Sequence, residues 1–212
     1  MVEDVLKRIS WLGHDAFRIG GTPTIYFDPW KVKSPQPADL ILISHDHFDH
    51  FSKEDVEKLS KADTVVVSTP AVVAQLSGDA RAAKPGDKLT VKGVTVEVVP
   101  AYNINKFRAP GQPFHPRQDA HLGFVVTVDG VRVYHTGDSD CIPEIADIKA
   151  DIALLPVSGT YVMTAEEAVD AARAIRPKVA IPMHYGDIVG SVADAQKFQR
   201  EAPVEVRILQ PE

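Results

Sequence analysis

Cysteine is almost absent, because the 212-residue chain has Cys141 and no other. A single cysteine cannot form a disulfide within the chain, and it cannot supply the several thiolates of a cysteine-based zinc cluster. A chain of this length buries roughly 70% of its unfolded surface on folding, so its core needs no disulfide or structural metal. We therefore expect one packed domain over residues 1–212 in a reducing cytoplasm. Because folding needs no metal, we expect any metal site in the chain to serve a chemical reaction.

Positive charge and long apolar runs are also scarce. Lys and Arg total 23 against 29 Asp and Glu, a net charge of -6, which argues against the broad basic surface that long nucleic acids require. The longest uncharged stretch, residues 152–165, contains Pro156 and Gly159 and is too short to cross a bilayer. The first residues are acidic where a secretory signal is basic. We expect a small-molecule substrate rather than a membrane or a long polymer, and we leave homo-oligomer formation open.

Apolar, β-branched runs that end abruptly in polar residues indicate buried strands. Five such runs are ADLILISHDH, DTVVVSTP, VRVYHTGD, DIALLPVSG and KVAIPMHYG. Successive strands are also predicted in segments 9–30, 88–102 and 122–137, with hairpin turns at residues 20–21, 93 and 129–130. The polar residues follow the runs, at strand ends where open sheets gather their sites.

Four helices are predicted from their caps. Ser52 begins a capping-box pattern, Thr69 caps a helix that runs as far as Gly78, and Thr164 and Ser191 open the third and fourth helices. Strands and helices alternate in two halves of the chain. This alternation indicates an α/β fold in which two sheets lie between helices.

The sharpest local feature is an H-x-H-x-D-H cluster directly after the strand LILIS, formed by His45, His47, Asp49 and His50. Neutral imidazole nitrogens and carboxylate oxygens are ligands that divalent zinc prefers. A tight turn beyond a rigid strand can aim several of them into one volume. The alternative, a solvated turn that happens to be rich in histidine, leaves two further polar sites downstream unexplained.

Those two sites are Asp138, in TGDS after VRVYH, and His184, in PMHYG after VAI. This order of motifs, with a further His between the cluster and Asp138, resembles the metallo-β-lactamase-fold hydrolases over nearly the whole chain. The GHDAF segment, the PMHYG string and the TAEEA helix are similar to a compact branch of lactonase-like (ascorbate-6-phosphate lactonase-like) and uncharacterised hydrolases. The resemblance implies a four-layer αββα sandwich of two mixed β-sheets flanked by helices.

The resemblance also implies a binuclear metal site with Zn²⁺ as the expected ion and Mn²⁺ as the alternative. The implied ligands are His45 and His47 for the first ion and Asp49, His50 and His184 for the second, with Asp138 bridging both. Tyr102 stands where related lactonase-like proteins often carry the third histidine of the first ion. His115 and His121 are the candidates for that place, and we prefer His115 because it lies in an irregular loop. Oxygen-reducing di-iron relatives carry Glu where His47 stands, which favours hydrolysis over redox chemistry.

Hydrolysis of an ester-type bond by hydroxide generated at the two ions is the reaction that the resemblance implies. Asp49 and Asp138 are the expected catalytic carboxylates, and Asp49 would orient the hydroxide. The alternatives are a non-catalytic, metal-stabilised interaction module and a phosphodiesterase or nuclease that acts on short nucleotides.

Substrate class rests on weaker signals. Segment 103–121 carries Lys106, Arg108 and Arg117, a local basic excess that could hold a phosphate or carboxylate. Ordinary solvated surface charge explains the same residues. The other candidates for substrate contact are His14, His121 and Tyr161. A small anionic phosphodiester and a lactone both stay open as substrates.

Overall fold

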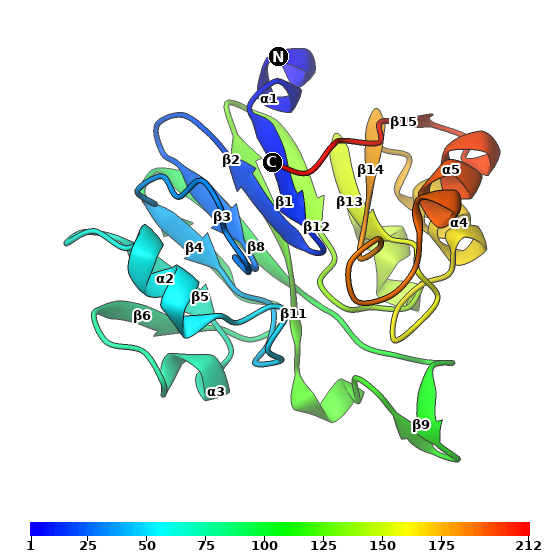
Figure 1. Ribbon diagram of the computed structural model, residues 1–212, viewed down its shortest axis with the longest axis horizontal. Coiled ribbons are helices and arrows are strands. Elements are labelled where there is room, and N and C mark those ends of the chain that lie inside the picture. The colour runs from blue at the N-terminus through cyan, green and yellow to red at the C-terminus, as the bar shows by residue number, and fades with distance from the viewer.

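The computed structural model describes residues 1–212, and its strands form two large sheets and a small hairpin (Figure 1). The first sheet has six strands in chain order: β1 (Ile9–Gly13), β2 (Ala16–Ile19), β3 (Ile25–Phe27), β4 (Leu40–Leu42), β5 (Val65–Ser68) and β6 (Asp79–Ala82). Strands β1 to β3 are antiparallel, whereas β3 to β6 run parallel, so the sheet is mixed.

The second sheet comes mainly from the other half of the chain. Its seven strands lie in the order β15 (Glu205–Val206), β14 (Val179–Met183), β13 (Ile152–Pro156), β12 (Val131–His135), β11 (Leu122–Val128), β8 (Val94–Pro100) and β7 (Lys88–Val91). Strands β12 to β15 are parallel, and the pairs β12–β11, β11–β8 and β8–β7 are antiparallel. This sheet is therefore mixed as well.

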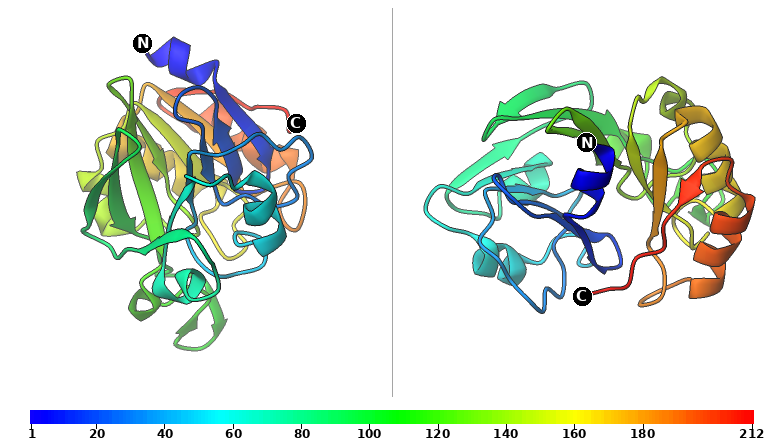
Figure 2. Two further views of the ribbon diagram at one scale, coloured as in Figure 1. Left: turned by 90° about the vertical axis from the view of Figure 1, so that its left-hand side faces the viewer. Right: turned by 90° about the horizontal axis from the view of Figure 1, so that it is seen from above.

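The helices lie outside the two facing sheets, except for the N-terminal helix, which lies at one end of the sheets and packs Val5 and Leu6 into the main core (Figure 2). They are α1 (Val2–Leu6), α2 (Lys53–Leu59), α3 (Pro70–Val73), α4 (Ala165–Ile175) and α5 (Val192–Glu201), with 3₁₀ turns η1 (Arg117–Asp119) and η2 (Pro143–Asp147). The hairpin of β9 (Phe107–Ala109) and β10 (Gln112–Pro113) projects from one end. No helix is long and apolar enough to cross a membrane. The expected layered α/β sandwich is confirmed.

The core shows why the central strands of the first sheet read as continuous apolar runs. Alternate residues of a strand point to opposite faces. Phe27 and Leu42 belong to the main apolar core, together with side chains of the second sheet, whereas Tyr26 and Ile41 pack with Leu59 of α2 on the outer face. Both faces of these strands are thus buried, as is usual for parallel strands covered by helices.

The helix caps were read correctly from the sequence, but one helix length was wrong. The Thr164 hydroxyl accepts a hydrogen bond from the backbone of Glu167 in a full capping box, and α5 begins after Ser191 as expected. Helix α3 ends at Val73 rather than near Gly78. The chain must extend there, because residues 79–82 form β6 and pair with β5.

Segment 9–21 was expected to form one strand before the turn at residues 20–21. The structure instead divides it into two strands, β1 and β2, joined by a tight turn. Gly13 and His14 adopt positive φ values of 112° and 50°, and the chain folds back so that β2 pairs with β1. This turn carries His14 and Asp15 inward, and both side chains are fully buried.

Candidate metal centre

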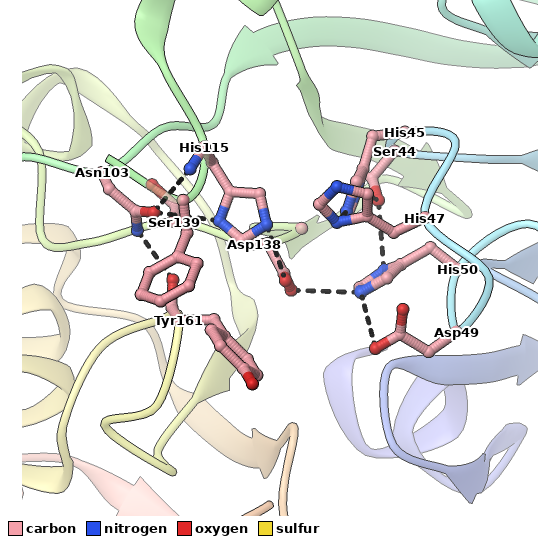
Figure 3. A network of polar contacts seen from close by, with 12 residues as sticks. Ser44, His45, His47, Asp49, His50, Asn103, His115, Asp138, Ser139 and Tyr161 are labelled. Atoms are coloured by element: carbon pink, nitrogen blue, oxygen red, sulfur yellow. Dashed lines mark hydrogen bonds and ion pairs between the residues drawn. The ribbon is translucent and has the colours of Figure 1, made fainter. Parts of the chain in front are cut away.

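Histidines and carboxylates from separate segments converge at one edge of the sheets (Figure 3). The turn between β4 and α2 carries His45, His47, Asp49 and His50, Asp138 follows β12, and His184 follows β14. The other donors come from the β1–β2 turn and from the loop before β11: His14, Asp15, His115 and His121. Three of these segments lie at the carboxyl ends of parallel strands, where an open sheet leaves room for a site.

His50 and His45 are each held from behind by an oxygen atom. The Nδ1 of His50 lies 2.8 Å from Oδ2 of the buried Asp28, and the Nδ1 of His45 lies 2.9 Å from the Ser44 hydroxyl. Asp28 also accepts hydrogen bonds from the Ser44 amide and hydroxyl, both at 2.6 Å. The turn after β4 is thereby fixed, and the Nε2 atoms of both rings point inward. Such outer partners orient the ligating nitrogen of metal-binding histidines.

His115 and His184 follow the same arrangement. The Nδ1 of His115 lies 3.0 Å from the Asn103 side-chain oxygen, and the Nδ1 of His184 lies 2.9 Å from the Ser158 hydroxyl. Their Nε2 atoms approach Asp138, at 3.3 Å from Oδ2 and 3.5 Å from Oδ1 respectively. Asp138 therefore lies between the two groups of histidines, in the place expected of a bridging carboxylate.

One group of donors is rich in carboxylates. The Nε2 of His50 lies 3.3 Å from Asp138 Oδ1, 3.6 Å from Asp15 Oδ2 and 3.8 Å from Asp49 Oδ2. Several of these buried atoms have no hydrogen-bond partner: both oxygens of Asp15, Oδ1 of Asp138, and Nε2 of His50 and of His184. Buried polar atoms without partners are costly, and oxygen and imidazole donors in this arrangement suit a divalent ion. The residues present fit a metal.

The second group consists of imidazoles. The Nε2 of His45 lies 2.9 Å from Nδ1 of His47, and donor atoms of His45, His115 and His121 lie within 4.8 Å of one another. The His121 ring stacks on that of His45 at 4.5 Å, and its buried Nδ1 has no partner. Both candidates for the third histidine thus reach this group. His115 alone of the two lies beside Asp138, at 3.3 Å, and the choice between the two histidines stays a prediction.

The two groups differ in their electrostatics. Burial lowers the pKa of His115 to about 4 and holds the pKa of His45 well below its ordinary value, so both rings are neutral at pH 7. Burial opposes ionisation of Asp138, but the charges of His50 and His184 outweigh it and keep the pKa of Asp138 well below its usual range. Asp138 is thus ionised and the imidazole group has free lone pairs, as metal binding requires.

A pocket of about 270 Å³ opens beside these donors. Its lining consists of His47, Asp49, His115 and Asp138 together with the apolar or aromatic Phe48, Phe114, Tyr161 and Ile188. The predicted substrate residue Tyr161 has a strained backbone at φ 69°, and its carbonyl accepts a hydrogen bond from Asn103 at 2.7 Å. A row of metal donors facing an apolar wall can take a small molecule with one polar and one apolar end.

Two other predicted substrate residues, His14 and His121, lie among the donors and do not line this pocket. The Nε2 of His14 is 3.0 Å from Asp49 Oδ2, so His14 supports that carboxylate directly. A larger pocket of about 570 Å³ lies on the other side of His14, between β1 and residues 208–211. Apart from His14, the only residue lining this larger pocket that could ligate a metal is Asp187, and its carboxylate pairs with Lys31.

The basic residues of segment 103–121 do not line the pocket beside the donors. Lys106 pairs with Glu167 at 2.6 Å, and Arg117 pairs with Glu144 at 2.7 Å. Arg108 donates to the backbone carbonyl of Phe114 at 2.9 Å and borders a shallow pocket on the outer side of the hairpin. Two of these three charges are thus neutralised by partners within the protein.

Asn103 is a site residue that the sequence did not reveal. Its side-chain oxygen accepts from the backbone and Nδ1 of His115, at 2.8 and 3.0 Å, and its amide donates to Asp140 and to the carbonyl of Tyr161 (Figure 3). It therefore joins the imidazole group to the pocket wall. The available signal was its position at a strand end, directly after Tyr102, where a histidine was sought.

Comparisons with known proteins agree with this arrangement. Residues 8–184 match the family model described as Beta-lactamase superfamily domain. The chain is 34% identical to a protein of Methanoculleus marisnigri named UPF0173 metal-dependent hydrolase, with 96% of this chain and 94% of that protein covered. A protein of the same name from Archaeoglobus fulgidus is 31% identical, with 96% of each chain covered.

Solved structures show the same fold. A crystal structure of a protein from Parabacteroides distasonis superposes with a TM-score of 0.83 at 33% identity, covering 96% of this chain and 93% of that chain. The structure of Igni18, a metallo hydrolase from Ignicoccus hospitalis, has a TM-score of 0.76 at 24% identity over 96% of this chain and 94% of that chain. The second likeness, at its lower identity, shows the fold alone.

Proposed function

Because this chain belongs to the β-lactamase superfamily of metal-dependent hydrolases, we propose that it hydrolyses an ester-type bond in a small substrate with an apolar part, at a centre of two divalent metal ions. The observation that carries this proposal is the 270 Å³ pocket, in which donors of a metal, including Asp138 with its unpartnered Oδ1, lie opposite an apolar wall. The lactone class fits the pocket best, because none of its lining residues is a lysine or an arginine.

The residues that would hold the ions form two sets. His45 would hold the first with His115 or His121, whose donor atoms cluster with its own, and with His47, which contacts His45 through Nδ1. Asp49, His50 and His184 would hold the second, and Asp138 would serve both. Bound divalent ions lower the pKa of water toward about 7 and polarise the substrate oxygen. Zn²⁺ suits the imidazole set, and Mn²⁺ is the alternative where carboxylates dominate.

Asp49 is the residue we assign to the attacking water. It borders the pocket, and the Nε2 of His14 holds its Oδ2 at 3.0 Å. Burial opposes its ionisation, but the hydrogen bond from His14 and the charge of His50 outweigh burial and lower the pKa of Asp49. An ionised carboxylate at this place can accept a proton from water and return it to the leaving alcohol.

The apolar wall orients the substrate. Phe114 and Tyr161 meet edge to face at 4.7 Å, and Phe48 is largely exposed at the rim. Burying an apolar group against these rings would bring the ester carbonyl toward Asp138 and Asp49. Because the pocket lies below the 300–1,000 Å³ typical of drug-sized ligands, the substrate is small.

Metal analysis combined with rates on three substrate classes tests the proposal. We expect two ions per chain and faster hydrolysis of simple lactones than of bis-p-nitrophenyl phosphate or a chromogenic cephalosporin, with the rate abolished in His50→Ala. Fewer than one ion per chain, or an unchanged rate in His50→Ala, overturns the hydrolase assignment. Preference for the phosphodiester would replace the lactone class, and metal binding without any hydrolysis would indicate an interaction module.

A further inference from the structure

Asp15 differs from Asp28, Asp55 and Asp140, the buried aspartates that lie outside the two groups of metal donors. It is fully buried, and neither carboxylate oxygen has a hydrogen-bond partner. By contrast, Asp28 accepts from Ser44, and Asp140 accepts two backbone amides, at 2.6 and 2.9 Å. Asp55, also buried, accepts from two backbone amides of residues 31 and 32. A buried carboxylate without such partners is strongly destabilising unless a positive charge compensates it.

The surroundings of Asp15 supply imidazoles but no lysine or arginine. Its Oδ2 lies 3.5 Å from Nε2 of His14, 3.6 Å from Nε2 of His50 and 3.8 Å from Nε2 of His184. The donor atoms of Asp15, His50, Asp138 and His184 all lie within 4.8 Å of one another. Three of these four residues already belong to the proposed second metal position, so Asp15 faces the same small volume.

The backbone of Asp15 is held in this orientation from both sheets. The positive φ of Gly13 and His14 turns the chain inward before Asp15. On the other side, Nε2 of His135 in β12 lies 2.9 Å from the Asp15 carbonyl oxygen, and Nδ1 of His135 accepts from the Gly137 amide. The carboxylate is therefore fixed by the meeting of two sheets.

We propose that Asp15 is a direct ligand of the second metal ion, in addition to the histidines and to Asp49 and Asp138. This inference rests on the proposed function, because it needs a metal at that position. It makes the two positions chemically unequal, since the second gains a third carboxylate while the first keeps its imidazoles and the shared Asp138. Carboxylate oxygens favour Mn²⁺, and imidazoles suit Zn²⁺. The second position should therefore retain Mn²⁺ more strongly than the first.

The isosteric variant Asp15→Asn tests this role, with Asp55→Asn as the matched control for loss of a buried carboxylate. In titrations with Mn²⁺ and with Co²⁺, we expect Asp15→Asn to keep the affinity of the first ion and to weaken the second by about 100-fold or more. The reason for this size is that even an outer partner of a ligand is commonly worth 10–100-fold. The visible absorption of the second equivalent of Co²⁺ should change, whereas Asp55→Asn should leave both affinities and the spectrum unchanged.

Thermal unfolding separates a ligand from a structural carboxylate. Metal-free Asp15→Asn should be at least as stable as the metal-free wild type, because the variant removes a buried carboxylate whose oxygens have no hydrogen-bond partner, and it should gain less stability from metal. Two ions bound by Asp15→Asn with wild-type affinity and spectrum would overturn the inference. A wild type that binds no second ion would instead refute the proposed binuclear centre.

Anomalous diffraction from crystals of metal-loaded wild-type protein gives a measurement that does not depend on a variant's folding. We expect an Asp15 oxygen at a carboxylate–metal bonding distance, roughly 2.0–2.2 Å for Zn²⁺. An ion at the second position with both Asp15 oxygens more than about 3 Å away would contradict the proposal, since that exceeds any such bond.

Discussion

Replacing Asp28 with asparagine should weaken one metal position and leave the other intact. Asp28 is buried behind His50, with Oδ2 2.8 Å from the Nδ1 of His50 and 2.6 Å from the Ser44 hydroxyl. Its Oδ1 accepts from the Ser44 amide at 2.6 Å. Asparagine keeps the shape but offers one acceptor oxygen where the carboxylate offers two. If that oxygen keeps the Ser44 amide, the new amide group faces the Nδ1 of His50 and cannot accept its proton.

The size of the effect follows from the role of an outer partner. Loss of such a partner typically costs 10–100-fold in metal affinity, which is about 1.4–2.8 kcal/mol. The affinity of the second ion should fall by this factor, because His50 serves that position. His45 keeps its own contact with Ser44 at 2.9 Å, so the first ion should be affected by less than about threefold. The metal-free protein should also lose about 1–3 kcal/mol of stability.

Competition titration against a chromophoric chelator resolves the two affinities, and urea unfolding of the metal-free protein gives the stability. Asp55→Asn is the control, because Asp55 is a buried carboxylate that accepts the amides of Lys31 and Val32 and faces no metal donor. If Asp28→Asn loses only stability, by the same amount as the control, then Asp28 shapes the turn and does not tune His50.

Four further outcomes are expected. Removal of metal by a chelator should abolish hydrolysis and lower the melting temperature, and added metal should restore both, because an ion that binds only the native state stabilises it. Asn103→Ala should cost about 2–4 kcal/mol in urea unfolding and weaken the first ion about tenfold, since the buried amide and Nδ1 of His115 lose their acceptor; a wild-type first-ion affinity would contradict this. Gly137→Ala should cost about 2–4 kcal/mol, because its φ is 61° and the added carbon would lie 2.6 Å from a carbonyl oxygen, whereas Gly130→Ala, at φ 75° with open space around it, should cost only about 1 kcal/mol. Burial raises the pKa of Cys141 to about 11, so a smaller fraction of the thiol is ionised at pH 8 than in a free thiol. Its labelling by iodoacetamide, followed by mass spectrometry, should be roughly 100-fold slower than that of a free thiol and should accelerate as the pH approaches 11. Labelling at the rate of a free thiol would show that the side chain is exposed in solution.

Local features of the sequence were sufficient for the helix starts and for the polar cluster. Thr164 and Ser191 begin helices as their caps predict, because a capping hydrogen bond spans only three residues. His45 and His50 lie on one turn after one buried strand, so their proximity is a consequence of spacing along the chain. The length of α3 was misjudged because the pairing of β6 with β5, a tertiary contact, ends that helix early.

The basic residues of segment 103–121 show what the local sequence pattern could not predict. Lys106 finds Glu167 61 residues away, and Arg117 finds Glu144 27 residues away. No pattern within the segment distinguishes a cation that awaits an anionic substrate from one already paired. The sequence therefore left a phosphorylated substrate open, and the packing of α4 and η2 against this loop moved the preference to an uncharged one.

By itself, the sequence determined the family, the alternation of strands and helices, and the donors that follow strand ends, since these depend on short spacings and on apolar periodicity. Only the tertiary structure decided that Asp15 faces the metal donors and that Asn103 supports His115. Asp15 points inward because the β1–β2 turn and His135, 120 residues away, meet across two sheets. A buried charge shows its need for a partner only once the chain has enclosed it, so the two sheets together, rather than any one segment, create the carboxylate-rich metal position.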